Sequence, residues 1–172
     1  MSIMTNFLKT LFRAVTGKYA RLLYLIIFCI FVGYQVKSAP EVRRTFVFYK
    51  VEGRSEVIEE RMIAKSGSDE ADISIYVQEA LLGPALPDTA PLLSRETKLL
   101  SLLLRDAVVY ADFSAEASLA PVEGGDLFQN MLTLNQGIRR NFPSVKDVHF
   151  FISGNEIYPE AFAALFDSPS GL

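Results

Sequence analysis

The pattern of apolar and polar positions along the chain predicts five strands and two helices. Residues 69–82 and 126–141 repeat apolar side chains every three or four positions, which is the spacing of an amphipathic helix. The order β-β-α-β-β-α-β predicts an α+β domain with one mixed sheet and two helices on one face. The predicted strands are short apolar runs bounded by polar or turn residues: 45–51, 57–64, 97–101, 107–114 and 148–152.

Polar residues at the ends of both helical segments fit the start and stop signals of helices. Ser68 is a candidate N-cap of the first helix, and Gly83 with Pro84 ends it. Asp126 is a candidate cap of the second helix, which ends at Asn141. The predicted domain spans residues 45–157, followed by an apolar tail over residues 158–172 that can pack as a terminal helix.

A different pattern precedes this domain, because residues 22–34 are uncharged and almost wholly apolar. Extended to residues 19–36, with Arg21 reaching back toward the headgroups, the run meets the lower limit of about 17 residues for a membrane-spanning helix. We therefore expect a transmembrane signal anchor at 19–36. A cytoplasmic basic leader over 1–18 precedes it, and a linker over 37–44 follows it. The resulting location is the inner membrane, crossed once, with the C-terminal domain extracytoplasmic.

Two other export signals fit the leader less well. A cleaved signal peptide needs small residues at its cleavage site, and residues 36–39 (Val-Lys-Ser-Ala) before Pro40 match that pattern poorly. A lipoprotein signal ends at its cysteine, whereas Cys29 lies inside the apolar run. Cys29 is the single cysteine, so an intrachain disulfide is excluded. The apolar residues between positions 7 and 15 have helical spacing. This segment is either a helix that lies on the inner leaflet or simply the basic region of an export signal.

Charge is distributed unevenly between the leader and the domain. Residues 1–44 hold seven Lys and Arg against one Glu (net +6), whereas the remainder holds ten against 19 acidic residues (net −9). Half of the residues are hydrophobic and the mean hydropathy is +0.23, which fits one packed domain plus a membrane segment. The acidic domain argues against nucleic acid as a partner, because nucleic-acid binding depends on neutralising phosphates.

The residues whose side chains could take part in catalysis do not form a recognisable active site. His149 is the single histidine and lies in a predicted strand, near Asp112, Asp147 and Ser114 in sequence, but nothing in the sequence fixes them around it. We predict no catalytic, cofactor-binding or metal-binding residue. Glu56, Glu59 and Glu60 are interpreted as an acidic solvated face. Arg139 and Arg140 are interpreted as a favourable charge pair at a helix C-terminus. Gly124 and Gly125 are interpreted as a turn, because the Lys of a phosphate-binding loop does not follow them.

Several segments in order resemble the GerMN domain, a family named for a spore germination and sporulation protein. The segments are Val77-Gln-Glu-Ala-Leu-Leu-Gly-Pro84, Thr97-Lys-Leu-Leu-Ser101, Val108-Val-Tyr-Ala-Asp-Phe-Ser114, Asn141-Phe-Pro-Ser-Val-Lys146 and Ile152-Ser-Gly154. The likeness covers residues 45–157. The sequence departs from the family at Ser94-Arg-Glu-Thr97, where a Pro-x-Gly-Thr turn is usual. It also departs at Leu132-Thr-Leu-Asn135, where Thr-Leu-Thr is common.

The resemblance implies a non-catalytic extracytoplasmic domain that acts in assembly or scaffolding of envelope, cell-wall or sporulation machinery. It also implies similarity to ring-building domains of secretion and sporulation assemblies, so protein partners or self-association are expected. The alternative is a module that binds peptidoglycan or another envelope polysaccharide, with rings supplied by Tyr49, Tyr76, Tyr110 and Phe150. A hydrolase would require Asp112 and His149 to converge in a cleft.

Overall fold

A computed structural model describes residues 24–29, 40–119 and 126–158. The chain divides into two compact units, Met1–Ala39 and Pro40–Leu172. In the first unit residues 24–29 are helical. Among the described residues, no helix combines the length and the apolar character needed to cross a membrane. The predicted leader, most of the predicted anchor at 19–36 and nearly all of the tail lie outside the described residues.

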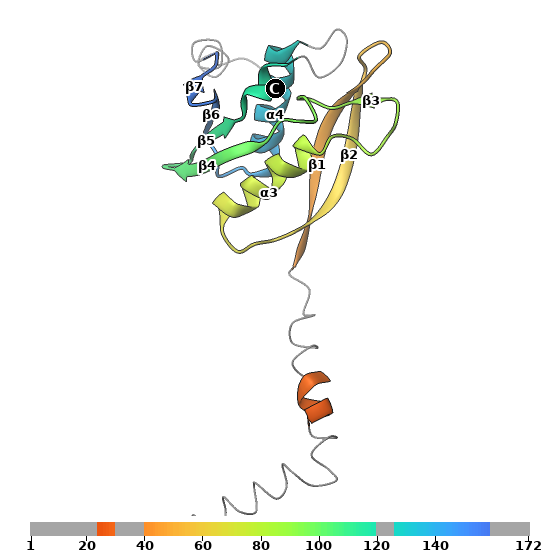
Figure 1. The fold of residues 1–172 in the computed structure, drawn as a ribbon, viewed down its shortest axis with the longest axis vertical. Helices are drawn as coiled ribbons and strands as arrows, with labels where there is room; N and C mark the ends of the chain where they lie inside the picture. The colour runs from red at the N-terminus through yellow and green to blue at the C-terminus, as the bar shows by residue number, and fades with distance from the viewer. Residues whose placement is uncertain (1–23, 30–39, 120–125, 159–172) are drawn as a thin grey trace, which may run out of the picture. The chain divides into compact units, whose positions relative to one another are not determined.

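The second unit follows the predicted order of elements with three short additions (Figure 1). The additions are the two-residue strands β3 and β7 and the 3₁₀ helix η1. The elements in chain order are β1 (Glu41–Lys50), β2 (Glu56–Ala64), α3 (Asp69–Leu81), β3 (Thr89–Ala90), β4 (Leu99–Arg105), β5 (Val108–Phe113), η1 (Ala115–Ser118), α4 (Leu127–Asn141), β6 (Asp147–Ile152) and β7 (Asn155–Glu156).

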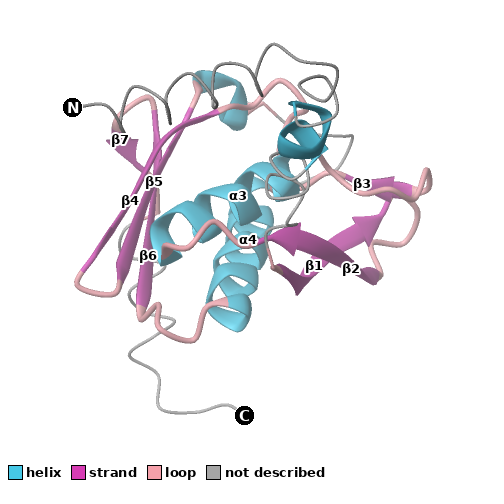
Figure 2. Cartoon of the chain, turned by 90° about the horizontal axis from the view of Figure 1, so that it is seen from below, coloured by secondary structure: helices cyan, strands magenta, loops and turns pink. Residues whose placement is uncertain are grey.

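The α+β class is confirmed, but the prediction of one mixed sheet with both helices on one face is wrong. The strands form an antiparallel sheet in the order β2-β1-β3 and a second sheet in the order β4-β5-β6-β7, in which β5 and β6 are parallel. Figure 2 shows α3 and α4 between the two sheets. In agreement with this view, α4 contacts both β1 and β6, and α3 contacts β4.

The edge of β1 explains why the strands do not join into one sheet. β3 pairs with β1 only at Tyr49 and Lys50. Further along, the side chain of Asn141 at the end of α4 hydrogen-bonds to the backbone of Thr45, so α4 occupies the place of a further strand. Among the strands that the structure describes, β4 pairs with β5 alone. Their connection is a two-residue turn at Asp106 and Ala107, whose φ angles of 52° and 67° fit a type I′ hairpin.

Aromatic rings from β1, α3 and the end of α4 form the centre of the core. Tyr76 of α3 stacks on Phe46 of β1 with ring centroids 4.6 Å apart, and Phe142 packs edge-on against Tyr76. The predicted stripe of α4 is confirmed, since Met131, Leu134 and Ile138 are fully buried. A stripe at this spacing buries one side of the helix and leaves the other side polar.

Gly137 allows the ring of Tyr76 to reach α4. The Tyr76 hydroxyl donates a hydrogen bond to the carbonyl of Thr45 at 3.2 Å, and burial raises the pKa of Tyr76 above its usual value. A Cβ on Gly137 would overlap the Tyr76 hydroxyl and lie 3.5 Å from its Cζ. The ring cannot swing away because Phe46 and Phe142 pack against it.

We expect Gly137→Ala to lower the free energy of unfolding, although alanine favours helix formation. Overpacking a core costs about 1–3 kcal/mol, against a gain in helix propensity of about 1 kcal/mol at most. Urea unfolding followed by circular dichroism measures the balance. Adding Tyr76→Phe removes the overlapping hydroxyl, so the double variant should be less destabilised than the sum of the two single variants. A Gly137→Ala protein as stable as the wild type would contradict the clash.

Candidate interaction surface

The four-stranded sheet has one face packed on the helices and one face turned outward. Register places Leu103, Tyr110 and His149 in one row across β4, β5 and β6. Asp112 and Phe151 are paired in the next row. We call these five residues together with Asp147 and Glu156 the outer sheet face. Leu103 is 49% exposed and Tyr110 is 36% exposed, so apolar surface remains open on the two strands β4 and β5.

His149 is held on the outer sheet face by an aromatic ring and two carboxylates. The ring of Tyr110 stacks on the imidazole, with centroids 5.3 Å apart and planes 15° apart. Nε2 of His149 lies 3.3 Å from a carboxylate oxygen of Asp147, and Nδ1 lies 2.6 Å from one of Glu156. Both ring nitrogens are therefore engaged by carboxylates, and neither is placed to accept a proton from a hydroxyl group.

The other two residues considered around His149 serve the backbone instead. Asp112 lies on the same face as His149 but accepts the backbone N–H of Gly154 at 3.0 Å, which holds the turn before β7. Ser114 accepts the backbone N–H of Lys98 at 3.0 Å. No group of His, Cys, Asp and Glu among the described residues could hold a metal ion. The chain's polar residues in this region thus connect strands and turns, and the absence of catalysis stays a prediction.

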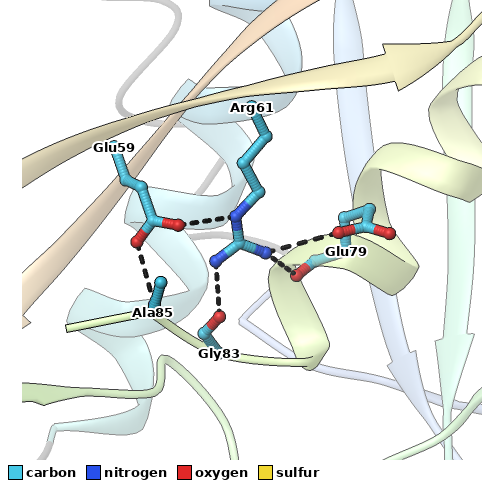
Figure 3. A network of polar contacts seen from close by, with 5 residues as sticks. All are labelled: Glu59, Arg61, Glu79, Gly83 and Ala85. Carbon is cyan, nitrogen blue, oxygen red and sulfur yellow. Dashed lines mark hydrogen bonds and ion pairs between the residues drawn. The ribbon is translucent and has the colours of Figure 1, made fainter. Parts of the chain in front are cut away.

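A polar network at the C-terminal end of α3 corrects one sequence-based interpretation (Figure 3). Glu59 is not on a solvated face: it pairs with Nε of Arg61 at 2.7 Å and accepts the backbone N–H of Ala85 at 3.1 Å. Burial alone would raise the pKa of Glu59, but the hydrogen bonds from Arg61 and Ala85 outweigh it and lower the pKa. Arg61 and its partners thus connect β2 to the C-terminal end of α3, whereas Glu56 and Glu60 are exposed as predicted.

The aromatic residues considered for sugar binding are divided between core and surface. Tyr76 and Phe150 are buried, and Tyr49 is half-buried with its hydroxyl hydrogen-bonded to Thr133 at 2.7 Å. Tyr110 alone of the four lies on the outer sheet face. A single ring beside three carboxylates is a small platform for a polysaccharide.

Comparison with known proteins assigns the fold. Neither a protein-family model nor a curated protein sequence matches the chain. The first GerMN domain of the sporulation protein GerM from Bacillus subtilis matches with a TM-score of 0.53 and 20% identity, over 67% of this chain and 86% of that one. The tandem GerMN domains of the same protein match with a TM-score of 0.51 and 20% identity, over 70% of this chain.

These similarities confirm the predicted resemblance at the level of the fold. The described domain has a GerMN-like fold. The chain spans 41% of the tandem structure, so it corresponds to one of the two repeated domains rather than to both.

Proposed function

We propose that the chain is a non-catalytic, membrane-anchored extracytoplasmic GerMN-like domain that acts in assembly or scaffolding of envelope, cell-wall or sporulation machinery. The GerMN-like fold, shared with a sporulation protein, is the observation that carries the proposal. The apolar run at residues 22–34 supplies the anchor in this proposal. A location on the outer side of the inner membrane follows from the basic residues that precede this run.

The outer sheet face is the surface that we assign to partner binding. Its apolar part, at Leu103 and Tyr110, lies on β4 and β5, and carboxylates of Asp112, Asp147 and Glu156 border it on β5, β6 and β7. Protein interfaces commonly combine an apolar centre containing aromatic residues with a polar rim. The carboxylates and imidazole are already paired within the sheet, so a partner can cover this face without leaving those groups unpaired.

We expect a photo-crosslinking residue in place of Leu103 to capture a specific protein, or a second copy of the chain, in living cells. Mass spectrometry would identify the product. A control carries the same residue at Ile58, which is more exposed than Leu103 (63% against 49%) but lies on the other sheet. Capture at Ile58 alone would contradict the assigned surface.

Two further results would contradict the proposed function itself. One is an absence of cross-links at either position, combined with a strict monomer by light scattering at all concentrations. The other is co-sedimentation with purified cell wall that Tyr110→Ala abolishes, because that result identifies a polysaccharide-binding module.

A further inference from the structure

An open groove of about 530 Å³ lies between the C-terminal end of α3 and the segment that enters β4. Its apolar wall consists of Leu81, Leu82 and Leu99, and Gln78 lines it from the preceding turn of α3. Leu82 is 70% exposed, the most exposed leucine among the described residues. Apolar surface of this kind is favourable to cover, because burial removes it from water.

The polar side of the groove is cationic, although the domain as a whole is acidic. Arg95 and Lys98 both line the groove and are exposed. Neither side chain forms an ion pair or a hydrogen bond with a residue that the structure describes. Other basic side chains do have such partners: Arg43 pairs with Glu60, and Lys50 pairs with Asp88. What distinguishes Arg95 and Lys98 is that both line one groove beside an apolar wall, in a domain with an excess of carboxylates.

Lys98 also borders a neighbouring groove of about 520 Å³, which Glu96, Ser114 and Glu116 complete. The pKa of Glu116 is lowered first by a hydrogen bond from Ser114 and to a smaller degree by the charge of Lys98. The Lys98 ammonium group thus stabilises the Glu116 carboxylate electrostatically without forming an ion pair with it. It remains available to bind a second carboxylate on the α3 side of the groove.

Thr97 adds a hydroxyl group with unused hydrogen-bonding capacity. It lines the same groove between Arg95 and Lys98, and it is 6% exposed. Its Oγ1 is buried and has no hydrogen-bond partner. Leaving a buried hydroxyl unpaired costs about 1–3 kcal/mol, so an acceptor that reached Thr97 would offset that cost.

We propose that this groove docks an acidic polypeptide segment of a partner protein, with carboxylates at Arg95 and Lys98 and an apolar side chain over Leu82. The inference rests on the proposed function, because it takes the domain to be a docking module. Charge complementarity and the apolar wall together select the ligand: a segment needs both acidic and apolar side chains to use the whole groove.

The probe is a short fluorescein-labelled peptide of alternating Glu and Leu, titrated with the full chain in a mild detergent and followed by fluorescence anisotropy. We expect saturable binding that weakens with added salt, and no binding of a matched peptide of alternating Lys and Leu. The double substitution Arg95→Gln with Lys98→Gln should weaken binding about tenfold, the size expected for two partly exposed ion pairs. The control is Arg105→Gln, which removes one exposed cation from the far end of β4 and is compared with each of the two single substitutions, Arg95→Gln and Lys98→Gln.

Each outcome has a defined meaning. Equal weakening by Arg105→Gln would show non-specific attraction and overturn the proposal. Unchanged binding of a Leu82→Ser variant would overturn the apolar contact. Displacement of the peptide by polygalacturonate at the same charge concentration would assign the groove to an anionic polysaccharide. A peptide that fails to bind, while Leu103 still cross-links to a partner in cells, would overturn the groove assignment and leave the scaffold function standing. Binding of the peptide without any cross-link at Leu103 would support the groove and contradict the outer sheet face as the partner surface.

Discussion

Replacing Arg61 with alanine is expected to cost about 3–4 kcal/mol of unfolding free energy, the lower part of the range for buried ion pairs that lose one partner, because this pair is only partly buried. Arg61 donates through Nη2 to the carbonyl of Gly83 at 2.6 Å and through Nη1 to the carbonyl of Glu79 at 2.9 Å. These carbonyls belong to the end of α3, where helix groups lack intrahelical partners. The guanidinium also lies 5.0 Å from the ring centroid of Phe46. The substitution therefore removes a helix cap, an ion pair and a packing contact together.

Urea unfolding of the domain measures this loss, and two variants test its cause. Arg61→Lys keeps the charge but not the planar fork, so it should recover only part of the stability. Arg43→Ala removes a similar pair from the opposite face of the hairpin. There the two side chains are 69% and 52% exposed, against 18% and 16% for Arg61 and Glu59. An exposed pair contributes about 1 kcal/mol at most. Equal costs at positions 43 and 61 would contradict the capping role.

The contact between Arg61 and Glu59 also predicts how the stability of the domain changes at acidic pH. The pKa of Glu59 is lower in the folded protein than its ordinary value, so its contribution is present above the unfolded pKa and is lost as pH falls through the folded pKa. Wild-type stability should therefore decline below about pH 4.3, the ordinary pKa of Glu. In Arg61→Ala that part of the decline should be smaller, because the hydrogen bond that lowers the pKa is gone.

Features that depend on neighbours in sequence could be predicted. Ser68 and Asp126 cap their helices as expected, accepting backbone N–H groups at 3.3 Å and 3.0 Å. The buried apolar positions of α4 follow from its spacing, and the order of the five longer strands along the chain follows from β propensity. The likeness to the GerMN fold, first indicated by short motifs, agrees with the structural comparison.

Features that depend on distant contacts could not be predicted. Arg61 lies in a run of acidic residues, and only the fold brings it to the end of α3. Glu156 belongs to a two-residue strand too short to give a pattern, so the second carboxylate on His149 was missed. The division into two sheets depends on Asn141, which in sequence is simply the last residue of a helix before Phe142 and Pro143.

Asn141 replaces a neighbouring strand at the open edge of β1, and its loss should be the second most damaging single change. The backbone N–H of Thr45 donates to Oδ1 at 2.9 Å, and Nδ2 donates to the carbonyl of Thr45 at 2.8 Å. Nδ2 also donates to the carbonyl of Gly137 at 2.8 Å. Asn141→Leu keeps the number of side-chain heavy atoms but leaves the backbone N–H of Thr45 without this acceptor, while the Thr45 carbonyl keeps the hydrogen bond from the Tyr76 hydroxyl. A cost of about 1–3 kcal/mol follows for the one polar group left unpaired.

Amide hydrogen exchange distinguishes this role from a general loss of helix stability. In Asn141→Leu the Thr45 amide should exchange faster than its neighbours Arg44 and Phe46, because its acceptor was the missing side chain. Asn155→Leu is the matched control, since Asn155 is exposed and its amide reaches only the carbonyl of Ser153 at 3.3 Å; surface changes of this kind stay within about 0.5 kcal/mol. Uniform acceleration of exchange across β1 would show that Asn141 acts through α4 alone. Selective acceleration at Thr45 would show that the side-chain amide of Asn141 directly pairs with the backbone at the open edge of β1.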